Sequence, residues 1–461
     1  MGSDPLDNQR YKRKDVMLKS ITFKNFKSYE KATLFLSPLT VLIGANASGK
    51  SNAIEGLRLL SWMAHGQKLS ALQYVMSNGE HIIRGRPSNL FYRGASAFEF
   101  GCETDSKEWN QLSLSVVSRN DGLHIQSETI SMSGASVPLY SLSTPSSGIS
   151  TDVSVAYNNF ARGGHKPHII CNDQMPIFTQ LSTPAVFGPD SYPSKVIPPV
   201  VGIFEQMLSS ILFLDPVPAR MRDYSFLAER ELQSDGANIS AVLANLCGGM
   251  LPKHMREERN RYLQAKQDIL SFVQSLPEQD IADIDFYREP RGGRMVVLIE
   301  TFGGRKERYD ASLLSDGTLR VLSIGAAMLS AREGSLVVIE EIDNGVHPSR
   351  AKHLLSRIQA VAQKRNLKVI LSTHNPALLD ALPSEAIPDV VFCYRDPKSG
   401  SSKLVRLEEI VDYPELLAQG TLGYLSVNGI IDRYAKNPQT DEDKKTRALA
   451  WLERMKKGGE A

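Results

Sequence analysis

The sequence predicts an α/β fold with a mixed or parallel P-loop core, an antiparallel β lobe and a helical insertion. Three observations support this prediction. A glycine-rich loop at residues 44–51 stands between an apolar strand and a helix-like stretch. Strand-like runs with hairpin spacing surround this loop, as in an antiparallel sheet. A second block, residues 335–371, alternates apolar strands with a helical pattern, as a parallel sheet does.

The loop GANASGKS, residues 44–51, fits the G-x-x-x-x-G-K-[ST] pattern at every fixed position. The apolar run Leu39–Ile43 before it is typical of a buried strand, and Ser51–Trp62 after it has helical spacing. Glycines let such a loop fold around a triphosphate, so that amide N–H groups and a helix N-terminus point at the anion. We therefore expect Lys50 to reach the β- and γ-phosphates of ATP and the Ser51 hydroxyl to bind Mg²⁺.

The composition of the 461 residues is that of an ordinary globular protein, with 42% hydrophobic and 23% charged residues. A formal net charge of +2 gives no argument for a nucleic-acid partner, although a local basic face stays open. The four cysteines are scattered without a C-x-x-C pair, which favours a reducing compartment. The sequence shows no membrane-length apolar run and no signal peptide, so we expect a cytoplasmic protein with no membrane contact.

The N-terminal part is expected to form most of the antiparallel sheet. Residues 1–16 form a polar lead-in or tag, and Leu18–Phe23 and Ala32–Leu36 read as strands ahead of the P-loop strand. Three further runs extend the sheet, with a turn at residues 120–122, and they cover residues 97–102, 112–118 and 123–130.

The middle of the chain is expected to be an insertion. Ser131–Pro199 is rich in Ser, Thr, Pro and Gly, which predicts loop or irregular surface. Within it, His165, His168 and Cys171 match no standard zinc spacing, so we interpret them as surface loop residues. Val200–Leu214 predicts one helix that ends at the prolines after it. Two more helices are expected over residues 238–246 and 253–276.

The last third holds the second block of motifs. Met295–Thr301 predicts a strand with a hairpin turn at residues 303–304. The sequence Leu314–Thr318 precedes a helical pattern, and the apolar strand after that helix ends in Glu340 and Glu341. Acidic residues placed there suit the binding of Mg²⁺ and the activation of water. The strand at residues 368–371 runs into His374, which we expect near a γ-phosphate.

These motifs, in this order, resemble the ABC-type ATPase heads of the RecF/SMC class. The compact form resembles the AAA-domain ATPases of bacterial anti-phage defence systems. The opening FKNFKS at residues 23–28 and the SDG-x-N-I pattern within Leu232–Leu246 are similar to the same class. The resemblance covers most of residues 17–409, is weak across residues 131–199 and does not extend to the tail.

The resemblance implies a role for each matching residue. Glu340 takes the Walker B position, where an aspartate is usual, and would hold Mg²⁺ with Ser51. Glu341 would be the general base and His374 the switch histidine. No Q-loop glutamine can be placed. The remaining implied residues are the Walker A residues Gly44, Asn46, Gly49, Lys50 and Ser51, the D-loop residue Asp343, the signature residues Ser315 and Gly317 that contact a second protomer's γ-phosphate, and Lys27 on nucleotide phosphates.

One P-loop and one signature per chain imply a head-to-tail homodimer, or a higher homo-oligomer, closed around two ATP molecules. The expected segments are a lead-in (1–16), an N-terminal ATPase lobe (17–130), an insertion and helical lid (131–290), a C-terminal ATPase lobe (291–411) and a helical tail (412–461). Within the tail, Leu416–Tyr434 is apolar enough to pack on the core or on a partner, and Asp441–Lys457 favours a solvated helix.

The sequence leaves three functions open for such an ATPase. The first is a switch that controls a partner effector, such as a nuclease or toxin in phage defence, because the chain shows a full ATPase motif set without a second catalytic domain. The second is an ATPase of DNA repair or DNA structure that clamps duplex DNA through basic segments such as Lys253–Arg261 and Arg288–Arg294. The third, an intrinsic nuclease with a Toprim domain after His374, is disfavoured because no acidic cluster ends a strand there.

Overall fold

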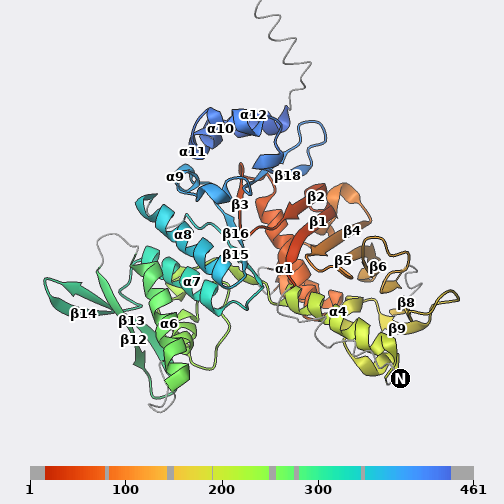
Figure 1. The fold of residues 1–461 in the computed structure, drawn as a ribbon, viewed down its shortest axis with the longest axis horizontal. Coiled ribbons are helices and arrows are strands. Elements are labelled where there is room, and N and C mark those ends of the chain that lie inside the picture. Colours follow the sequence, from red (N-terminus) through yellow and green to blue (C-terminus); the bar gives the residue numbers. More distant parts are fainter. Residues whose placement is uncertain are drawn as a thin grey trace, which may run out of the picture.

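A six-stranded, mostly parallel sheet forms the centre of the molecule (Figure 1). The computed structural model describes residues 16–77, 82–142, 150–188, 190–248, 256–274, 280–343 and 348–437. The strand order is β10-β15-β16-β3-β17-β18, and only β18 runs antiparallel to its neighbour. The strands are β10 (Leu212–Leu214), β15 (Leu336–Ile339), β16 (Lys368–Ser372), β3 (Leu39–Ile43), β17 (Val391–Arg395) and β18 (Ser402–Arg406).

Strand β3 shows why this sheet lies at the centre. All five of its residues are buried, as a strand covered on both faces requires. Leu42 belongs to the hydrophobic cluster that includes residues of α1 (Lys50–Ala64) and α4 (Tyr192–Ser209). Val41 and Ile43 belong to the cluster that includes residues of α7 (Asp316–Ser330) and α8 (Pro348–Lys364). The predicted helices after the P-loop and around the second motif block are confirmed, and they cover opposite faces of the sheet.

The predicted antiparallel lobe is confirmed as an eight-stranded sheet of order β2-β1-β4-β5-β6-β7-β8-β9. Its β5–β6 hairpin turns at residues 120–121, where the sequence predicts a turn. The strands are β1 (Leu18–Phe26), β2 (Tyr29–Phe35), β4 (Ala97–Thr104), β5 (Gln111–Arg119), β6 (Gly122–Ser131), β7 (Tyr140–Leu142), β8 (Asp152–Tyr157) and β9 (His168–Asn172).

The prediction of irregular surface over residues 131–199 is wrong for much of that segment. Strands β7, β8 and β9 continue the antiparallel sheet, followed by α3 (Ile177–Gln180) and the start of α4. In β8, Val153 and Val155 are buried while Ser154 between them is exposed, a pattern too short to stand out in the sequence. Helix α4 forms despite internal prolines because buried residues such as Ile197 and Phe204 pack it against the core.

Two related expectations also need correction. Val200–Leu214 is not one helix, because α4 ends at Ser209 and Leu212–Leu214 is the edge strand β10, paired in parallel with β15. His168 and Cys171 are strand residues of β9 rather than loop residues, and Cys171 is buried. His168 Nδ1 lies 2.9 Å from the Ser154 hydroxyl on the neighbouring strand. Among the described residues, no group of three or more His, Cys, Asp and Glu side chains is arranged to hold a metal.

A third sheet and several helices complete the chain. Its strands are β11 (Ser225–Phe226), β12 (Ile281–Arg288), β13 (Gly293–Phe302) and β14 (Arg305–Asp310), with the predicted turn at residues 303–304. The helices packed nearby are α5 (Ile239–Leu246) and α6 (Arg256–Val273). The remaining helices are α2 (Leu72–Ser77), α9 (Pro376–Asp380), α10 (Tyr413–Ala418), α11 (Leu422–Val427) and α12 (Ile430–Lys436).

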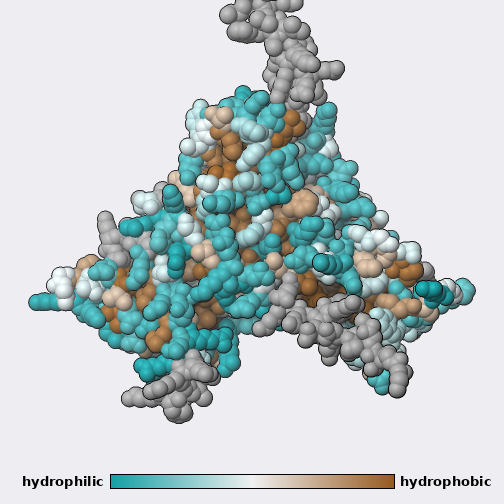
Figure 2. All heavy atoms as spheres, in the orientation of Figure 1, coloured by the Kyte–Doolittle hydropathy of each residue, from teal (hydrophilic) through white to brown (hydrophobic). Residues whose placement is uncertain are grey.

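The C-terminal helices pack on the core, as their apolar residues predict, through buried Leu416, Leu425 and Ile431. Some hydrophobic residues also lie on the surface of these helices at the top of the view (Figure 2). In α11, Val427 is exposed. The predicted charged helix at residues 441–457 lies outside the described residues. Among the helices that the structure describes, none has the length and apolar character needed to cross a bilayer.

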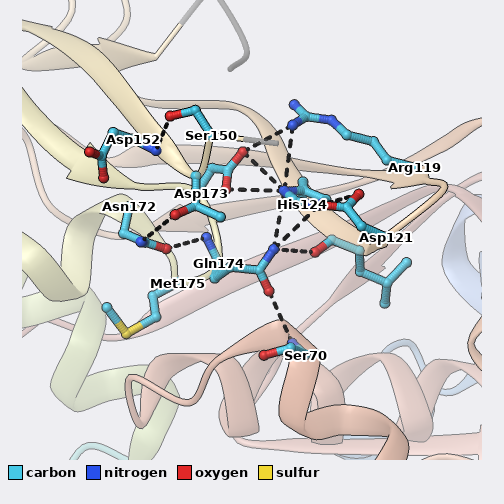
Figure 3. A network of polar contacts seen from close by, with 12 residues as sticks. Ser70, Arg119, Asp121, His124, Ser150, Asp152, Asn172, Asp173, Gln174 and Met175 are labelled. Atoms are coloured by element: carbon cyan, nitrogen blue, oxygen red, sulfur yellow. Dashed lines mark hydrogen bonds and ion pairs between the residues drawn. The ribbon is translucent and has the colours of Figure 1, made fainter. Parts of the chain in front are cut away.

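A buried polar network fastens β9 to the β5–β6 hairpin (Figure 3). His124 Nδ1 lies 3.1 Å from both carboxylate oxygens of Asp173, and its Nε2 lies 3.0 Å from Asp121 Oδ1. Asp173 is fully buried, and Arg119 Nη1 lies 3.3 Å from its Oδ2. Gln174 adds hydrogen bonds to His124 and to the backbone N–H of Ser70. The network joins segments that come from β5, β6 and the end of β9.

Candidate nucleotide-binding site

A cavity of about 410 Å³ opens where the P-loop meets the carboxyl ends of the core strands. This is the position where open α/β sheets bind ligands. The cavity brings together residues that the sequence predicts from segments far apart in the chain. Those lining it are Asn46, Gly49, Lys50 and Ser51 from the P-loop region, Glu340 and Glu341 after β15, and His374 after β16.

The P-loop backbone requires glycine at Gly44 and Gly49. Gly49 has φ +129°, and a Cβ there would lie 2.6 Å from Ser402 Oγ and 2.9 Å from the Tyr29 hydroxyl. Gly44 has φ +135°, and a Cβ there would collide with the Cys393 carbonyl oxygen. Two hydroxyl groups from neighbouring strands fix the loop. The Tyr29 hydroxyl donates to the Gly49 carbonyl oxygen at 2.9 Å, and the Ser402 hydroxyl donates to the Ser48 carbonyl oxygen at 2.6 Å.

Lys50 is the first residue of α1 and lies over this loop. Its ammonium donates to the carbonyl oxygens of Gly44 at 2.5 Å and Ala45 at 3.1 Å. Burial lowers the pKa of Lys50, whereas the nearby Asp343 and Glu341 carboxylates act in the opposite direction. The amine is therefore partly desolvated and held by weak acceptors, an arrangement in which phosphate oxygens would be stronger partners.

The two glutamates that follow β15, Glu340 and Glu341, contact different parts of the site. Glu341 is exposed and has a left-handed backbone with φ +47°, a conformation that is uncommon for a residue other than glycine. Its N–H donates to Ser372 Oγ at 3.0 Å, which ties it to the end of β16. Glu340 turns the other way, and its Oε1 lies 2.7 Å from Arg58 Nη2 on α1.

Asp343 and His374 contact each other at the edge of the cavity. His374 Nδ1 lies 3.4 Å from Asp343 Oδ2, and the histidine side chain is 63% exposed. The other oxygen, Asp343 Oδ1, is buried and has no hydrogen-bond partner among the described residues, and the same holds for Ser48 Oγ. Buried polar atoms of this kind usually have a partner, so these two fit a site completed by a bound polar group.

The donors present fit a magnesium nucleotide. Ser51 and Glu340 line the same cavity and offer a hydroxyl and a carboxylate oxygen, the ligand types that Mg²⁺ prefers. Lys50 and the N-terminus of α1 offer positive charge and N–H donors to phosphate.

Five predicted site residues are not among those that line this cavity, namely Gly44, Asp343, Lys27, Ser315 and Gly317. Lys27 pairs through its ammonium with the buried Glu55 carboxylate. The Ser315 hydroxyl caps α7 by accepting the Thr318 N–H at 3.1 Å, and Gly317 follows in the first turn of that helix. The P-loop and the Ser315–Gly317 signature therefore do not share one cavity within a single chain.

Sequence reasoning missed Arg84, Asp215 and Arg395, which also line the cavity. Arg395 Nε donates to the Ala47 carbonyl oxygen at 3.0 Å, so this arginine contacts the P-loop itself. Arg395 is the last residue of β17, and Asp215 directly follows β10. A charged residue at the carboxyl end of each apolar strand was the signal for both. Arg84 comes from an irregular segment and has no comparable signal.

Comparison with known proteins agrees with this arrangement. The family profile described as "AAA domain, putative AbiEii toxin, Type IV TA system" matches residues 39–112 and 196–380. The curated protein "DNA replication and repair protein RecF" of Leptospira interrogans is 32% identical over 80 residues, 17% of this chain and 20% of the relative. RecF of Gloeobacter violaceus is 40% identical over 72 residues, 15% of this chain and 17% of the relative. The chain thus matches about a fifth of the length of these relatives.

Among solved structures, an Smc head bound to the C-winged helix domain of ScpA is 13% identical with a TM-score of 0.46, covering 84% of this chain and 97% of that one. An Smc head with an extended coiled coil, bound to the C-terminal domain of ScpA derived from Pyrococcus furiosus, is 13% identical with a TM-score of 0.47, covering 88% and 99%.

The family match spans both motif blocks, from the P-loop strand to the helix after His374. The fold combines a parallel P-loop core with an antiparallel lobe, and the motifs follow the order of RecF/SMC-class ABC-type ATPases. The chain belongs to the family described as "AAA domain, putative AbiEii toxin, Type IV TA system", within this RecF/SMC class of ABC-type ATPases.

Proposed function

We propose that this ATPase-class protein hydrolyses ATP and acts as a switch that closes as a homodimer around two nucleotides. The observation that carries the proposal is the division of the site within one chain. Lys50, Glu341 and His374 line one cavity, whereas Ser315 lies outside it at the exposed start of α7. A second copy that offers its signature segment would complete the site.

Each residue has a defined task in this proposal. The P-loop amides and Lys50 bind the phosphates, and Ser51 with Glu340 holds Mg²⁺, which neutralises charge on the phosphates when bound. Glu341 accepts a proton from the attacking water, and Ser372 holds the Glu341 backbone in place. His374 donates toward the γ-phosphate while Asp343 orients its ring. In the opposed copy, Ser315 and Gly317 meet the same γ-phosphate.

Closure follows from differential affinity. ATP that contacts both copies binds the closed dimer more tightly than the open protein, so it shifts the equilibrium toward closure. Hydrolysis removes those contacts, and the dimer opens.

The proposal also includes a division of the chain into four segments. They are an N-terminal lobe (17–130), an insertion (131–290), a C-terminal lobe (291–411) and a tail (412–461).

The output we propose is control of a protein effector, such as a nuclease or toxin in bacterial phage defence. The family description, with its putative toxin of a type IV toxin–antitoxin system, supports an output of this kind. A cytoplasmic site of action belongs to the same proposal.

A clamp on duplex DNA is the second candidate, supported by the alignments to RecF, which is described as a DNA replication and repair protein. One basic segment gives it less support than the sequence predicts. Arg294 is buried, and its Nη1 donates to the Gly293 carbonyl oxygen, so only part of the Arg288–Arg294 segment faces solvent. In the other segment, residues 253–255 lie outside the described residues.

Phosphate release from ATP by the purified protein tests the catalytic part. The wild type is expected to turn over ATP, Lys50→Ala to lose nucleotide binding, and Glu341→Gln to bind ATP while hydrolysis falls by about 10²–10⁴-fold. Equal turnover by the wild type and Glu341→Gln would contradict the assignment. Affinity for duplex DNA that rises steeply as salt falls would favour the clamp.

A further inference from the structure

Arg58 is an unassigned cation beside the proposed Mg²⁺ ligand Glu340. It lies on α1 beyond the P-loop, and its Nη2 lies 2.7 Å from Glu340 Oε1. The two side chains are only 14% and 15% exposed, so the pair is largely shielded from water. The guanidinium also lies over the Phe213 ring of β10, 4.9 Å from the ring centroid. Its position is therefore fixed by an aromatic face as well as by the carboxylate.

The pair stands between two cavities. Ser51 and Glu340 line the nucleotide cavity and also a larger cleft of about 1130 Å³ beside it. Arg58 lines only the larger cleft. The glutamate at this position is one methylene longer than the aspartate that the family resemblance expects. Its carboxylate extends far enough to meet Arg58, and it can face either cavity.

We propose that Arg58 is the internal counterion of Glu340, which Mg²⁺ must displace or share when a nucleotide binds. This inference rests on the proposed nucleotide function and deepens it. Without Mg²⁺, Arg58 neutralises the carboxylate and keeps it from repelling phosphates. When Mg²⁺ is present, the arginine competes for the same carboxylate and adds a like charge close to the metal. Arg58 thus acts as a positioning residue that lowers the gain in nucleotide affinity obtained from Mg²⁺.

The test measures ADP affinity by calorimetry, with and without Mg²⁺, for the wild type and three variants. In Arg58→Gln, Glu340 loses its cation, so affinity without Mg²⁺ falls and affinity with Mg²⁺ rises. The ratio of the two dissociation constants should increase by about fivefold or more, the lower end of typical coupling between sites. Arg58→Lys keeps a positive charge but loses the planar contact with Phe213, so its ratio should lie between those of the wild type and Arg58→Gln.

Arg220→Gln is the matched control. Arg220 lines the same larger cleft but pairs with Asp235 at 2.6 Å and has no contact with Glu340. Its Mg²⁺ ratio should equal that of the wild type. An unchanged or lower ratio in Arg58→Gln would overturn the inference. A rise in Arg220→Gln equal to that in Arg58→Gln would overturn it too, because any arginine of the cleft would then produce the effect.

A second measurement needs no nucleotide and separates this inference from the proposed function. Thermal unfolding of the nucleotide-free wild type, Arg58→Gln, Glu340→Gln and the double variant forms a double-mutant cycle. If the two residues are counterions, the double variant should lose less stability than the two single variants together. Additive losses would contradict the pairing even where ADP binds. If the wild type binds no ADP, the proposed function fails while this cycle still decides the pair. If Arg58→Gln does not fold, Arg58→Met replaces it in both tests, because methionine also removes the charge and keeps much of the apolar side chain.

Discussion

The backbone N–H of Glu341 donates to Ser372 Oγ at 3.0 Å, which joins the ends of two neighbouring core strands. This bond holds Glu341 in a left-handed conformation, φ +47°, beside the nucleotide cavity. Backbone strain of this kind costs about 1–3 kcal/mol and persists only where the surroundings hold it. Strand β16 therefore positions both His374, which follows it, and the proposed general base Glu341, which follows β15.

Ser372→Ala removes this hydroxyl, so Glu341 should relax away from its position. We expect kcat for ATP hydrolysis to fall by about tenfold, with KM changed little, because misplacement of a catalytic group affects the chemical step. Steady-state phosphate release measures both constants. The control is Ser335→Ala, which removes a hydroxyl of a buried residue directly before β15 and outside the cavity. An equal kcat for Ser372→Ala and wild type would contradict the role of this bond.

Gly49→Ala should damage the P-loop. The added Cβ would meet Ser402 Oγ at 2.6 Å in a backbone with φ +129°, so the loop must shift and its N–H groups lose alignment. We expect nucleotide affinity to fall by about tenfold or more, corresponding to 1.4 kcal/mol or more. Calorimetry with ADP and Mg²⁺ gives the affinity.

Gly66→Ala is the matched control, since Gly66 also has a positive φ, +71°, but has open space around it. That variant should lose about 1 kcal/mol of stability and keep its nucleotide affinity. Comparable affinity losses in the two variants would show that positive φ alone, rather than the contact with Ser402, accounts for the effect.

The sequence predicted the features that depend on residues close together in the chain. The P-loop, the turn at residues 303–304 and the acidic end of β15 are local patterns, and the structure has them as predicted. The Arg58–Glu340 pair was not predictable, because 282 positions separate the two residues. The prolines in α4 indicated a loop, yet the burial of Ile197 and Phe204 outweighs their cost. Tertiary packing therefore determines that this segment is helical.

The buried network around Asp173 should contribute strongly to stability (Figure 3). Asp173→Ala leaves buried His124 and Arg119 without their shared carboxylate, which should cost about 3–5 kcal/mol of unfolding free energy. Denaturant unfolding measures the loss. Glu103→Ala is the control, since its pair with Lys19 is partly exposed and should cost less than about 1 kcal/mol. None of these residues lines the nucleotide cavity, so ADP affinity of the folded variants should not change.

Glu128 should make stability depend on pH. Burial raises the pKa of Glu128 to about 7, while the Tyr140 hydroxyl and the N–H groups of Ile177 and Phe178 oppose this rise. The folded state therefore holds a proton between about pH 4.5 and 7 that the unfolded state has lost. The contribution of Glu128 to the free energy of unfolding is fully present at low pH. It falls as the pH rises through that window and does not change further above it.

Glu128→Gln removes this titration. The unfolding free energy of the variant minus that of the wild type should rise from pH 5 to pH 7 and then level off. Denaturant unfolding across that range tests it, and Asp152→Asn, at an exposed position of β8, is the matched control for replacing a carboxylate by an amide. A flat difference for Glu128→Gln would contradict the raised pKa.

The proposed closure of two copies around ATP is tested most directly by the mass of Glu341→Gln in light scattering. The variant is expected to bind ATP and hydrolyse it slowly, so that the closed state accumulates. The mass should double with ATP and Mg²⁺ and remain that of a monomer with ADP or without nucleotide. A protein that binds ATP yet stays monomeric, or keeps one larger mass under all conditions, would contradict closure through Ser315 and Gly317.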